Sequence, residues 1–255
     1  RSYSVTGVQT CALPISKYLA PSREYLQKWA EIDSLKGVLF GLDLALNSKM
    51  INRVEEIEPS IKSNLFLVEG YFNALGLLAH GYPAAATMGG VNDSEEAIRK
   101  VYKNLFEAGI SRVVLCFDND ERGRKYTLDY MKYFSSRPEI LTDVILLENY
   151  KDINDGLQKE GTDFFTKLQL YKLEPVHAFI KLERLEEGIE KGGFERHIAL
   201  MKVARFFSEM HPVHREKINQ DILMERLGIS KNEWIALFEE LPSEREKERI
   251  KNDLA

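Results

Sequence analysis

Apolar residues between positions 64 and 147 follow two patterns that take turns along the chain. Short apolar runs such as LFLV and RVVLCF are typical of buried strands, and the longer segments between them repeat apolar residues at helical spacings of three and four. The predicted strands are 65–70, 84–90, 111–118 and 142–147, and the predicted helices are 71–81, 92–109 and 121–134. This alternation predicts an α/β fold, a mainly parallel sheet with helices on both faces.

Beyond Gly161 only the helical spacing continues. The segments HIALMKVARFF and ILMERLGI place apolar residues three and four apart and contain no strand-like run. We therefore predict a sheet domain over 64–160, followed by a C-terminal α-helical bundle over 161–255. Residues 16–63 have a weaker pattern, with one helix expected around EYLQKWAEI.

Several helix ends have recognisable signals. Asp93 and Glu96 have the spacing of a capping box at the start of the helix at 92–109, and Ser230 and Glu233 have the same spacing before KNEWIALFEEL. Gly109 suits the end of the first of these helices, because glycine readily adopts the left-handed conformation that follows many helices.

Composition narrows the class of protein. Apolar residues make up 44% and charged residues 29% of the chain, which is ordinary for a globular protein. No window approaches the length of apolar sequence that a membrane span needs, so we predict no membrane partner. The net charge of -5 neither requires nor excludes a nucleic-acid partner, since a local basic groove is compatible with an acidic total. Cys116 lies in an apolar run, where a reduced, packed thiol is expected, as in a cytoplasmic protein.

The first residues require separate treatment. VTGVQTCALPI, from Val5 to Ile15, resembles the translation of a sequencing-library adapter, and we interpret residues 1–15 as an artefact. On this interpretation the natural sequence begins upstream of Ser16, and the chain is a fragment.

Acidic residues follow three of the predicted strands. Glu69 ends the first strand, Asp118 and Asp120 follow the third, and Asp152 lies after the fourth. In a parallel sheet the carboxyl ends of the strands meet at one edge, where ligands bind. Carboxylates gathered at one point need a compensating cation, and Mg²⁺ prefers such oxygen ligands. An alternative remains open, because Asp120 and Asp152 also suit the N-caps of the following helices, and Glu69 suits the dipole of the helix behind it.

Basic residues follow the third strand as well. Arg122, Arg124 and Lys125 fall in the first turn of the predicted helix, where the helix dipole disfavours cations. Bound phosphates would relieve that cost, although a solvated basic face is the simpler alternative. Gly123 is compatible with close backbone approach to a ligand or with a turn.

His211 and His214 are spaced three apart beside Pro212 in MHPVHRE. Without further histidine or cysteine partners, we expect them to mark a loop-to-helix junction with the proline at the first helical position, and not a metal site.

The segments LFLVEGYFNAL, VVLCFDNDERGRK and YKDINDGL resemble, in this order, the three motifs of the TOPRIM domain, most closely that of bacterial DnaG-type primases. That family typically shows VEGYMD, FDGDxAGxxA and KDPDE or KDxND. SKYLAPS and VLFGLDLAL are similar to its upstream segments, which makes residues 16–63 a remnant of the N-terminal polymerase subdomain.

The resemblance implies a DNA primase, a nucleotidyltransferase that makes RNA primers on a single-stranded DNA template from ribonucleoside triphosphates. It implies Mg²⁺ or Mn²⁺ held by Glu69, Asp118, Asp120 and Asp152, with Glu69, Asp118 and Asp120 catalytic. Arg122, Arg124 and Lys125 would bind the nucleotide phosphates. The family's zinc belongs to a module upstream of this segment, and a replicative helicase is the expected partner.

Two positions depart from the family pattern. Asn73 replaces the acid that ends the first motif, and Asn154 replaces the second acid of the last. An amide oxygen ligates Mg²⁺ without adding charge, so a second or third cation is expected to bind less tightly.

Three alternatives stay open. A TOPRIM topoisomerase or nuclease would cleave phosphodiesters with the same acids, and a primase-helicase would contain a similar segment. INQDILMERLGISKNEWIALFEEL also has the helix, glycine turn and helix of a DNA-binding helix-turn-helix, although its second helix is acidic where a DNA reader is usually basic.

Overall fold

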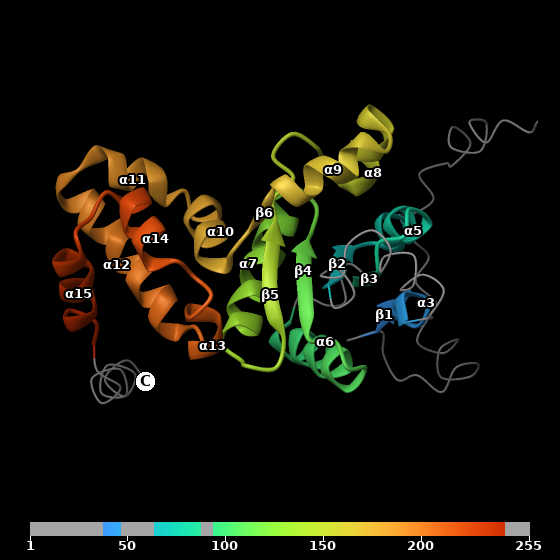
Figure 1. Cartoon of the computed structure of the whole chain (residues 1–255), viewed down its shortest axis with the longest axis horizontal. Helices are drawn as coiled ribbons and strands as arrows, with labels where there is room; N and C mark the ends of the chain where they lie inside the picture. The colour runs from blue at the N-terminus through green and yellow to red at the C-terminus, as the bar shows by residue number, and fades with distance from the viewer. Residues whose placement is uncertain (1–37, 47–63, 88–93, 243–255) are drawn as a thin grey trace, which may run out of the picture. The chain divides into compact units, whose positions relative to one another are not determined.

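The described part of the chain contains one β-sheet with α-helices packed around it (Figure 1). The computed structural model describes residues 38–46, 64–87 and 94–242. All of these fall in one of two units, residues 36–255, and only that unit is described below. The helix expected around EYLQKWAEI and the adapter-like residues 1–15 lie outside the described residues.

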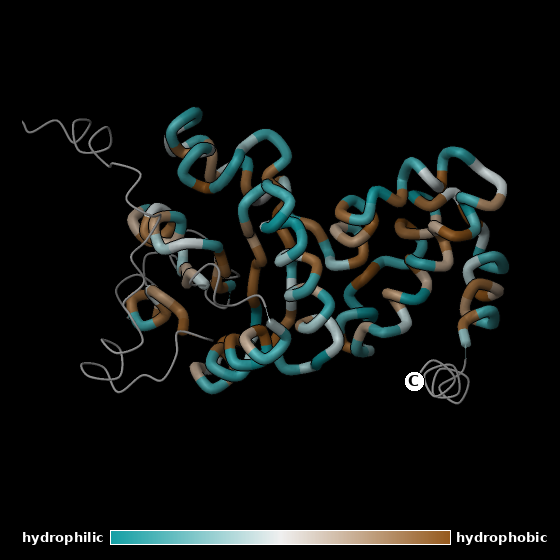
Figure 2. Tube along the Cα trace, turned by 180° about the vertical axis from the view of Figure 1, so that it is seen from behind, coloured by the Kyte–Doolittle hydropathy of each residue, from teal (hydrophilic) through white to brown (hydrophobic). Residues whose placement is uncertain are grey.

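The sheet has six strands in the order β1-β3-β2-β4-β5-β6. The four central strands are parallel, and the two edge strands run antiparallel to their neighbours. The strands are β1 Leu39–Phe40, β2 Asn64–Glu69, β3 Ala84–Thr87, β4 Arg112–Cys116, β5 Leu141–Ile145 and β6 Lys172–Leu173. The predicted α/β class and the four predicted strands are confirmed. Figure 2 shows the strands mostly in the brown of apolar residues, as expected for strands buried on both faces.

One prediction about the sheet is wrong, because a strand does occur after Gly161. β6 pairs with the end of β5, with Val144 opposite Leu173. Two residues are too few to leave a period in the sequence, and the pairing uses backbone groups that side-chain patterns do not encode.

The helices between the strands are α5 Tyr71–Ala79, α6 Glu95–Glu107 and α7 Glu121–Ser135, and α3 Leu42–Leu46 follows β1. The chain passes from β2 to β3 on one side and then crosses to β4 on the other side of β2. Right-handed connections therefore place α5 on one face and α6 and α7 on the opposite face. The packing of α6 against α7 agrees with this arrangement. The order of strands reverses between β2 and β4, which is the point where open α/β sheets bind their ligands.

The start of α6 differs from the expected capping box. Ser94 is the N-cap, and its Oγ accepts a hydrogen bond of 3.2 Å from the backbone N–H of Ala97. Asp93 lies outside the described residues. Ser94 and Asp93 are both good caps, so the sequence pattern alone did not decide between adjacent positions. The end of the helix is as predicted, since Gly109 follows it with φ of +77°.

The remaining helices follow the sheet. They are α8 Ile153–Glu160, α9 Asp163–Leu170, α10 Pro175–Leu182, α11 Leu185–Lys191, α12 Gly193–Glu209, α13 Pro212–Arg215, α14 Gln220–Leu227 and α15 Lys231–Glu239. α10 packs against β5 and α7 as well as against α11 and α12. Within this helical part the rings of Phe179 and Phe206 stack at 4.4 Å between centroids.

The pair of helices that resembled a helix-turn-helix packs through its apolar side. Gly228 between α14 and α15 is in the left-handed conformation. Trp234 of α15 lies edge-on against Phe207 of α12, and both side chains are buried. The apolar side of α15 is therefore used in packing against α12.

The two histidines of MHPVHRE lie at a helix start, as predicted. His211 is the N-cap of α13 and Pro212 is its first residue. His214 is buried, its Nε2 lies 2.9 Å from the carbonyl oxygen of Arg137, and burial lowers its pKa. This contact joins α13 to the end of α7. None of the helices in the described ranges is long and apolar enough to cross a membrane.

The predicted capping box of α15 is present, with Ser230 Oγ accepting from the backbone N–H of Glu233 and the Glu233 carboxylate accepting from the backbone N–H of Ser230. We expect Ser230→Ala to lower the free energy of unfolding by about 1 kcal/mol. Ser208→Ala is the matched control, because its hydroxyl only donates to the carbonyl of Arg205 within α12. The measurement is urea unfolding of both variants; equal stabilities would contradict the capping role.

Candidate functional site

The candidate site begins where β2 and β4 end. Val68 of β2 pairs with Cys116 of β4. Glu69 is the residue after Val68 and Asp118 is the second residue after Cys116, so both acids lie just beyond the same pair of residues in the sheet. The helices that continue from these two strands lie on opposite faces and leave the space between their starts open to a ligand. The structure therefore brings together the first two predicted motifs.

The turn after β2 needs a glycine. Gly70 has φ of +76°, and its N–H donates a 3.2 Å hydrogen bond to the carbonyl of Thr87 at the end of β3. This conformation, which is unfavourable for other residues, turns the chain from Glu69 directly into α5.

The surroundings of Asp118 disfavour its charged form. Burial is the main cause that raises its pKa, to about 7, and the carboxylates of Glu69, Asp152 and Asp120 raise it further. Lys151 opposes this with a positive charge. The other three predicted acids are thus close enough to influence the Asp118 carboxylate, and a cation there would be electrostatically favoured.

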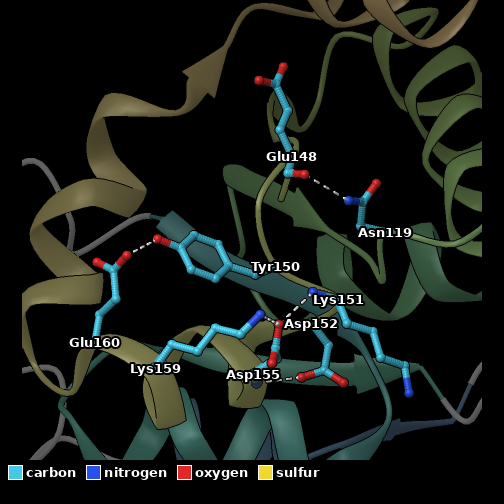
Figure 3. A network of polar contacts seen from close by, with 8 residues as sticks. All are labelled: Asn119, Glu148, Tyr150, Lys151, Asp152, Asp155, Lys159 and Glu160. Carbon is cyan, nitrogen blue, oxygen red and sulfur yellow. Dashed lines mark hydrogen bonds and ion pairs between the residues drawn. The ribbon is translucent and has the colours of Figure 1, made fainter.

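Asp120 and Asp152 each cap a helix. The Oδ1 of Asp120 accepts a 2.7 Å hydrogen bond from the N–H of Gly123 at the start of α7. The Oδ1 of Asp152 accepts a 2.8 Å bond from the N–H of Asp155 at the start of α8 (Figure 3). The capping interpretation is therefore correct for both residues. It leaves the second oxygen of each carboxylate for another role.

Asn73 connects three parts of the site. Its Nδ2 donates to the backbone carbonyl of Glu69 at 2.9 Å and to Oδ1 of Asp118 at 3.1 Å. Its Oδ1 accepts from Nδ2 of Asn154 at 2.8 Å, with the backbone N–H of Asn154 at 3.3 Å. Asn73 is only 6% exposed, so these bonds satisfy a buried amide.

The two departures from the family pattern are therefore in direct contact. With carboxylates at both positions, two negative charges would meet here beside Asp118 and would need a cation or a proton between them. The Asn73–Asn154 pair replaces that requirement with a neutral hydrogen bond. It also links α5 to α8, which pack closely together. A Cβ on Gly76 of α5 would lie 3.0 Å from Oδ1 of Asn154.

Gly123 allows a close backbone approach, but to the protein itself. A Cβ at this position would lie 2.0 Å from the carbonyl oxygen of Asp118. The first turn of α7 consequently packs directly on the loop that holds Asp118. The hypothesis that Gly123 makes room for a ligand is not needed to explain the residue.

The three predicted phosphate-binding residues differ in their contacts. Arg124 donates from Nε and Nη2 to Oδ1 of Asn119, at 3.1 and 3.0 Å. Arg122 donates to the hydroxyl of Tyr126 at 2.9 and 2.6 Å. Lys125 is exposed. Their role towards phosphate stays a prediction.

A small cavity of about 90 Å³ adjoins Asp118 at the carboxyl ends of β4 and β5. Asp118, Asn119 and Arg124 line it together with Glu148 and Lys181. Asn119 joins the loops around it, since its N–H donates to the carbonyl of Lys151 at 2.7 Å and its Nδ2 reaches the carbonyl of Glu148 at 3.4 Å (Figure 3).

Two lysines of this region had no role in the predicted site. Lys181 comes from α10, far along the sequence, and its Nζ contacts Oε1 of Glu148 at 2.5 Å. Nothing in the local pattern of α10 distinguishes this lysine. Lys151 is different, because it immediately precedes Asp152 in the third motif and could have been identified there. Its ammonium group is directed away from the Asp155 carboxylate in Figure 3.

The predicted acids suit a divalent cation in their chemistry but do not form a compact cluster in the described residues. Glu69, Asp118, Asp120 and Asp152 offer the oxygen ligands that Mg²⁺ prefers, and the charge around Asp118 favours a cation. Within the described ranges, however, no three acidic, histidine or cysteine side chains are close enough to form a ready-made metal site. The residues fit Mg²⁺ in their chemistry, and the four-acid set stays a prediction.

Comparison with known proteins identifies the class of domain. Residues 66–157 match the family described as Toprim-like. The chain is 36% identical over 106 residues to the DNA primase of Thermotoga maritima, covering 40% of this chain and 17% of that protein. It is 32% identical over 111 residues to the DNA primase of Rickettsia felis, covering 42% and 18%. The chain thus matches less than a fifth of the length of these relatives. Residues 66–157 are thus a Toprim-like region that is similar in sequence to DNA primases, as its three motifs predicted.

Solved structures agree on the fold. A DNA primase domain from Pseudomonas aeruginosa superposes with a TM-score of 0.55 at 19% identity, covering 81% of this chain and 60% of that one. The Escherichia coli primase catalytic core superposes with a TM-score of 0.51 at 20% identity, covering 77% and 59%. At these identities the likeness establishes the architecture, which is that of the DnaG catalytic core.

The Asn73–Asn154 pair leads to a stability prediction. Asn73→Asp removes the donor to Asp118 and places a second carboxylate beside it, so we expect the free energy of unfolding at neutral pH to fall by about 1–3 kcal/mol without divalent cations. Asn232→Asp, on the exposed start of α15, is the control with the same charge change and should be close to neutral. Urea unfolding in a chelating buffer measures both; an Asn73→Asp variant as stable as the control would contradict the proposed contact.

Proposed function

We propose that this chain is the TOPRIM and helical part of a DNA primase, which makes short RNA primers on single-stranded DNA by nucleotidyl transfer. The observation that carries the proposal is the convergence of Glu69 and Asp118 at the point where the strand order reverses. The primase matches to the same segment support it.

In this proposal Glu69, Asp118, Asp120 and Asp152 hold Mg²⁺ or Mn²⁺. The ion would supply charge neutralisation for the triphosphate and the departing pyrophosphate. Glu69 and Asp118 present carboxylates from the ends of two adjacent strands. Asp120 and Asp152 contribute the oxygen that does not cap a helix, while the capping oxygen orients each side chain.

The remaining polar residues position the substrate and the acids. Arg124 lies on the cavity beside Asp118 and is held by Asn119, in a place to contact a phosphate. Arg122 and Lys125 would extend this basic surface along the first turn of α7. Asn73 fixes the orientation of Asp118 through a neutral donor. Because the Asn73–Asn154 pair adds no charge, we expect fewer cations to bind tightly than with acids at both positions.

The partners follow from the proposed activity. The substrates are ribonucleoside triphosphates and a single-stranded DNA template, and a DnaG primase catalytic domain of similar fold has been solved bound to single-stranded DNA. A replicative helicase would bring the enzyme to the replication fork in the cytoplasm. The family's zinc would belong to a module outside this segment.

Asp118→Asn tests the proposed metal site directly. The substitution keeps the shape and the acceptor for Asn73 but removes a charge from a crowded acidic position. We expect unchanged or increased stability in chelating buffer, together with loss of the thermal stabilisation that Mg²⁺ gives the wild-type chain. Binding of Mn²⁺, followed by electron paramagnetic resonance, should weaken by about tenfold or more, as for loss of a charged ligand worth at least 1.4 kcal/mol.

Asp129→Asn in the middle of α7 is the matched control and should keep normal Mn²⁺ binding. In the complete primase, Asp118→Asn should abolish primer synthesis on single-stranded DNA and Asp129→Asn should not. Normal primer synthesis by the Asp118→Asn enzyme would overturn the site. Cation-dependent nicking of DNA without nucleotides would favour phosphodiester cleavage over primer synthesis.

A further inference from the structure

A second polar region lies at the other end of the strands from the acids. A cleft of about 570 Å³ is bordered by the amino ends of β4 and β5, by β6, and by the segment that connects α13 to α14. Its volume is in the usual range for small-molecule sites. Its polar lining is rich in cations, contributed by Arg112, Lys172, Lys217 and Arg226.

Arg112 and Lys172 share a single carboxylate. Nε of Arg112 lies 3.9 Å, and Nζ of Lys172 lies 3.7 Å, from the same Oδ2 of Asp143. Both distances exceed those of hydrogen bonds, so neither cation makes a close, directional pair with this oxygen. One negative charge therefore stands between two positive groups from different strands.

Lys217 adds a third cation to this group. Partial burial lowers its pKa, the positive charge of Arg112 and Lys172 lowers it further, and Asp143 opposes the shift. Among the residues that the structure describes, no carboxylate lies within ion-pair distance of Lys217. Lys217 is nevertheless exposed and accessible to a ligand.

The other charged groups that line the cleft also have partners. Arg226 donates to Oε1 of Glu186 at 2.6 Å, and Nδ1 of His177 lies 3.3 Å from Oε2 of Glu174. The Arg226–Glu186 pair is neutral overall. Glu174 keeps its negative charge, because burial lowers the pKa of His177, and it lies close enough to Asp143 to interact with that carboxylate. Arg112, Lys172 and Lys217 carry three positive charges against the two carboxylates of Asp143 and Glu174, which leaves one positive charge in excess.

We propose that this cleft binds a phosphate-bearing anion through Arg112, Lys172 and Lys217. A phosphate of a nucleotide or of a nucleic-acid strand would supply the missing negative charge and accept hydrogen bonds from more than one of the cations. The site is separate from the acidic one, because it adjoins the amino ends of β4 and β5 while the acids follow the carboxyl ends. The proposal does not depend on primer synthesis.

Binding here would also join two parts of the fold. Arg112 and Lys172 belong to the sheet, whereas Lys217 belongs to the helical part after α13. An anion bound to all three would stabilise their contact, so the thermal midpoint should rise with anion concentration.

The test uses inorganic pyrophosphate in a chelating, low-salt buffer, which prevents cation-mediated binding at the acidic site. Isothermal titration calorimetry should show binding that Lys217→Gln weakens by about fivefold, since a partly exposed charge pair is worth up to about 1 kcal/mol. Lys231→Gln, on the exposed start of α15, is the matched control and should bind as the wild type does.

Asp143→Asn should change the affinity for pyrophosphate in the opposite direction to Lys217→Gln. Removing the carboxylate that competes for Arg112 and Lys172 should tighten pyrophosphate binding, which a merely structural role of Asp143 would not do. Unfolding curves establish that each variant is folded. Equal binding by wild type, Lys217→Gln and Asp143→Asn would overturn the proposal, as would the absence of binding.

Competition separates the two sources of phosphate. Displacement of pyrophosphate by a single-stranded DNA oligonucleotide would assign the cleft to a nucleic-acid backbone. Displacement by ATP but not by the oligonucleotide would assign it to a nucleotide. Either result supports an anion site. Asp118→Asn should change neither the binding of pyrophosphate nor its displacement by these competitors.

Discussion

The parallel pairing of β2 with β4 is the constraint on which the candidate site depends. Both strands are buried and apolar, so moving either by one residue would turn core side chains towards the wrong face. The register that satisfies the core places Glu69 and Asp118 just beyond the same rung. The reversal of strand order at this pair directs α5 and α7 to opposite faces and keeps the ends of the strands accessible. The packing of the hydrophobic core thereby fixes the position of acidic side chains that would be too costly to bury within the core.

These acids repel one another, and the surrounding structure limits the cost of holding them together. The raised pKa of Asp118 reflects both its burial and its acidic neighbours. Asp120 and Asp152 are stabilised by helix N–H groups, and Lys151 supplies an opposing charge. The Asn73–Asn154 pair keeps two further positions neutral while it continues to orient Asp118. These contacts lower the free-energy cost of holding the acids near one another in the folded protein.

Much of the fold was predictable from local patterns. Each central strand is a long enough apolar run to be recognised, and helices such as α7 have both a period and a cap. The capping box of Ser230 and Glu233 was predicted and is present, because it depends only on residues three positions apart. β6 was missed because a two-residue strand is specified by its neighbour β5 and not by its own side chains. The cap of α6 was misplaced by one residue, since Ser94 and Asp93 have similar preferences.

For the site, the sequence by itself determined the candidate acids, their order and the strands that precede them. It also identified Asn73 and Asn154 as departures, because both lie within recognisable motifs. Only the tertiary structure decided that these two amides bond to each other, that Gly123 packs on the backbone of Asp118, and that Lys181 of α10 reaches the cavity beside it. The first and the last of these join residues distant in the sequence, and the second depends on how the chain turns from β4 into α7. Local patterns record the chemistry available at a position, whereas the pairing and packing of the whole chain decide which groups meet.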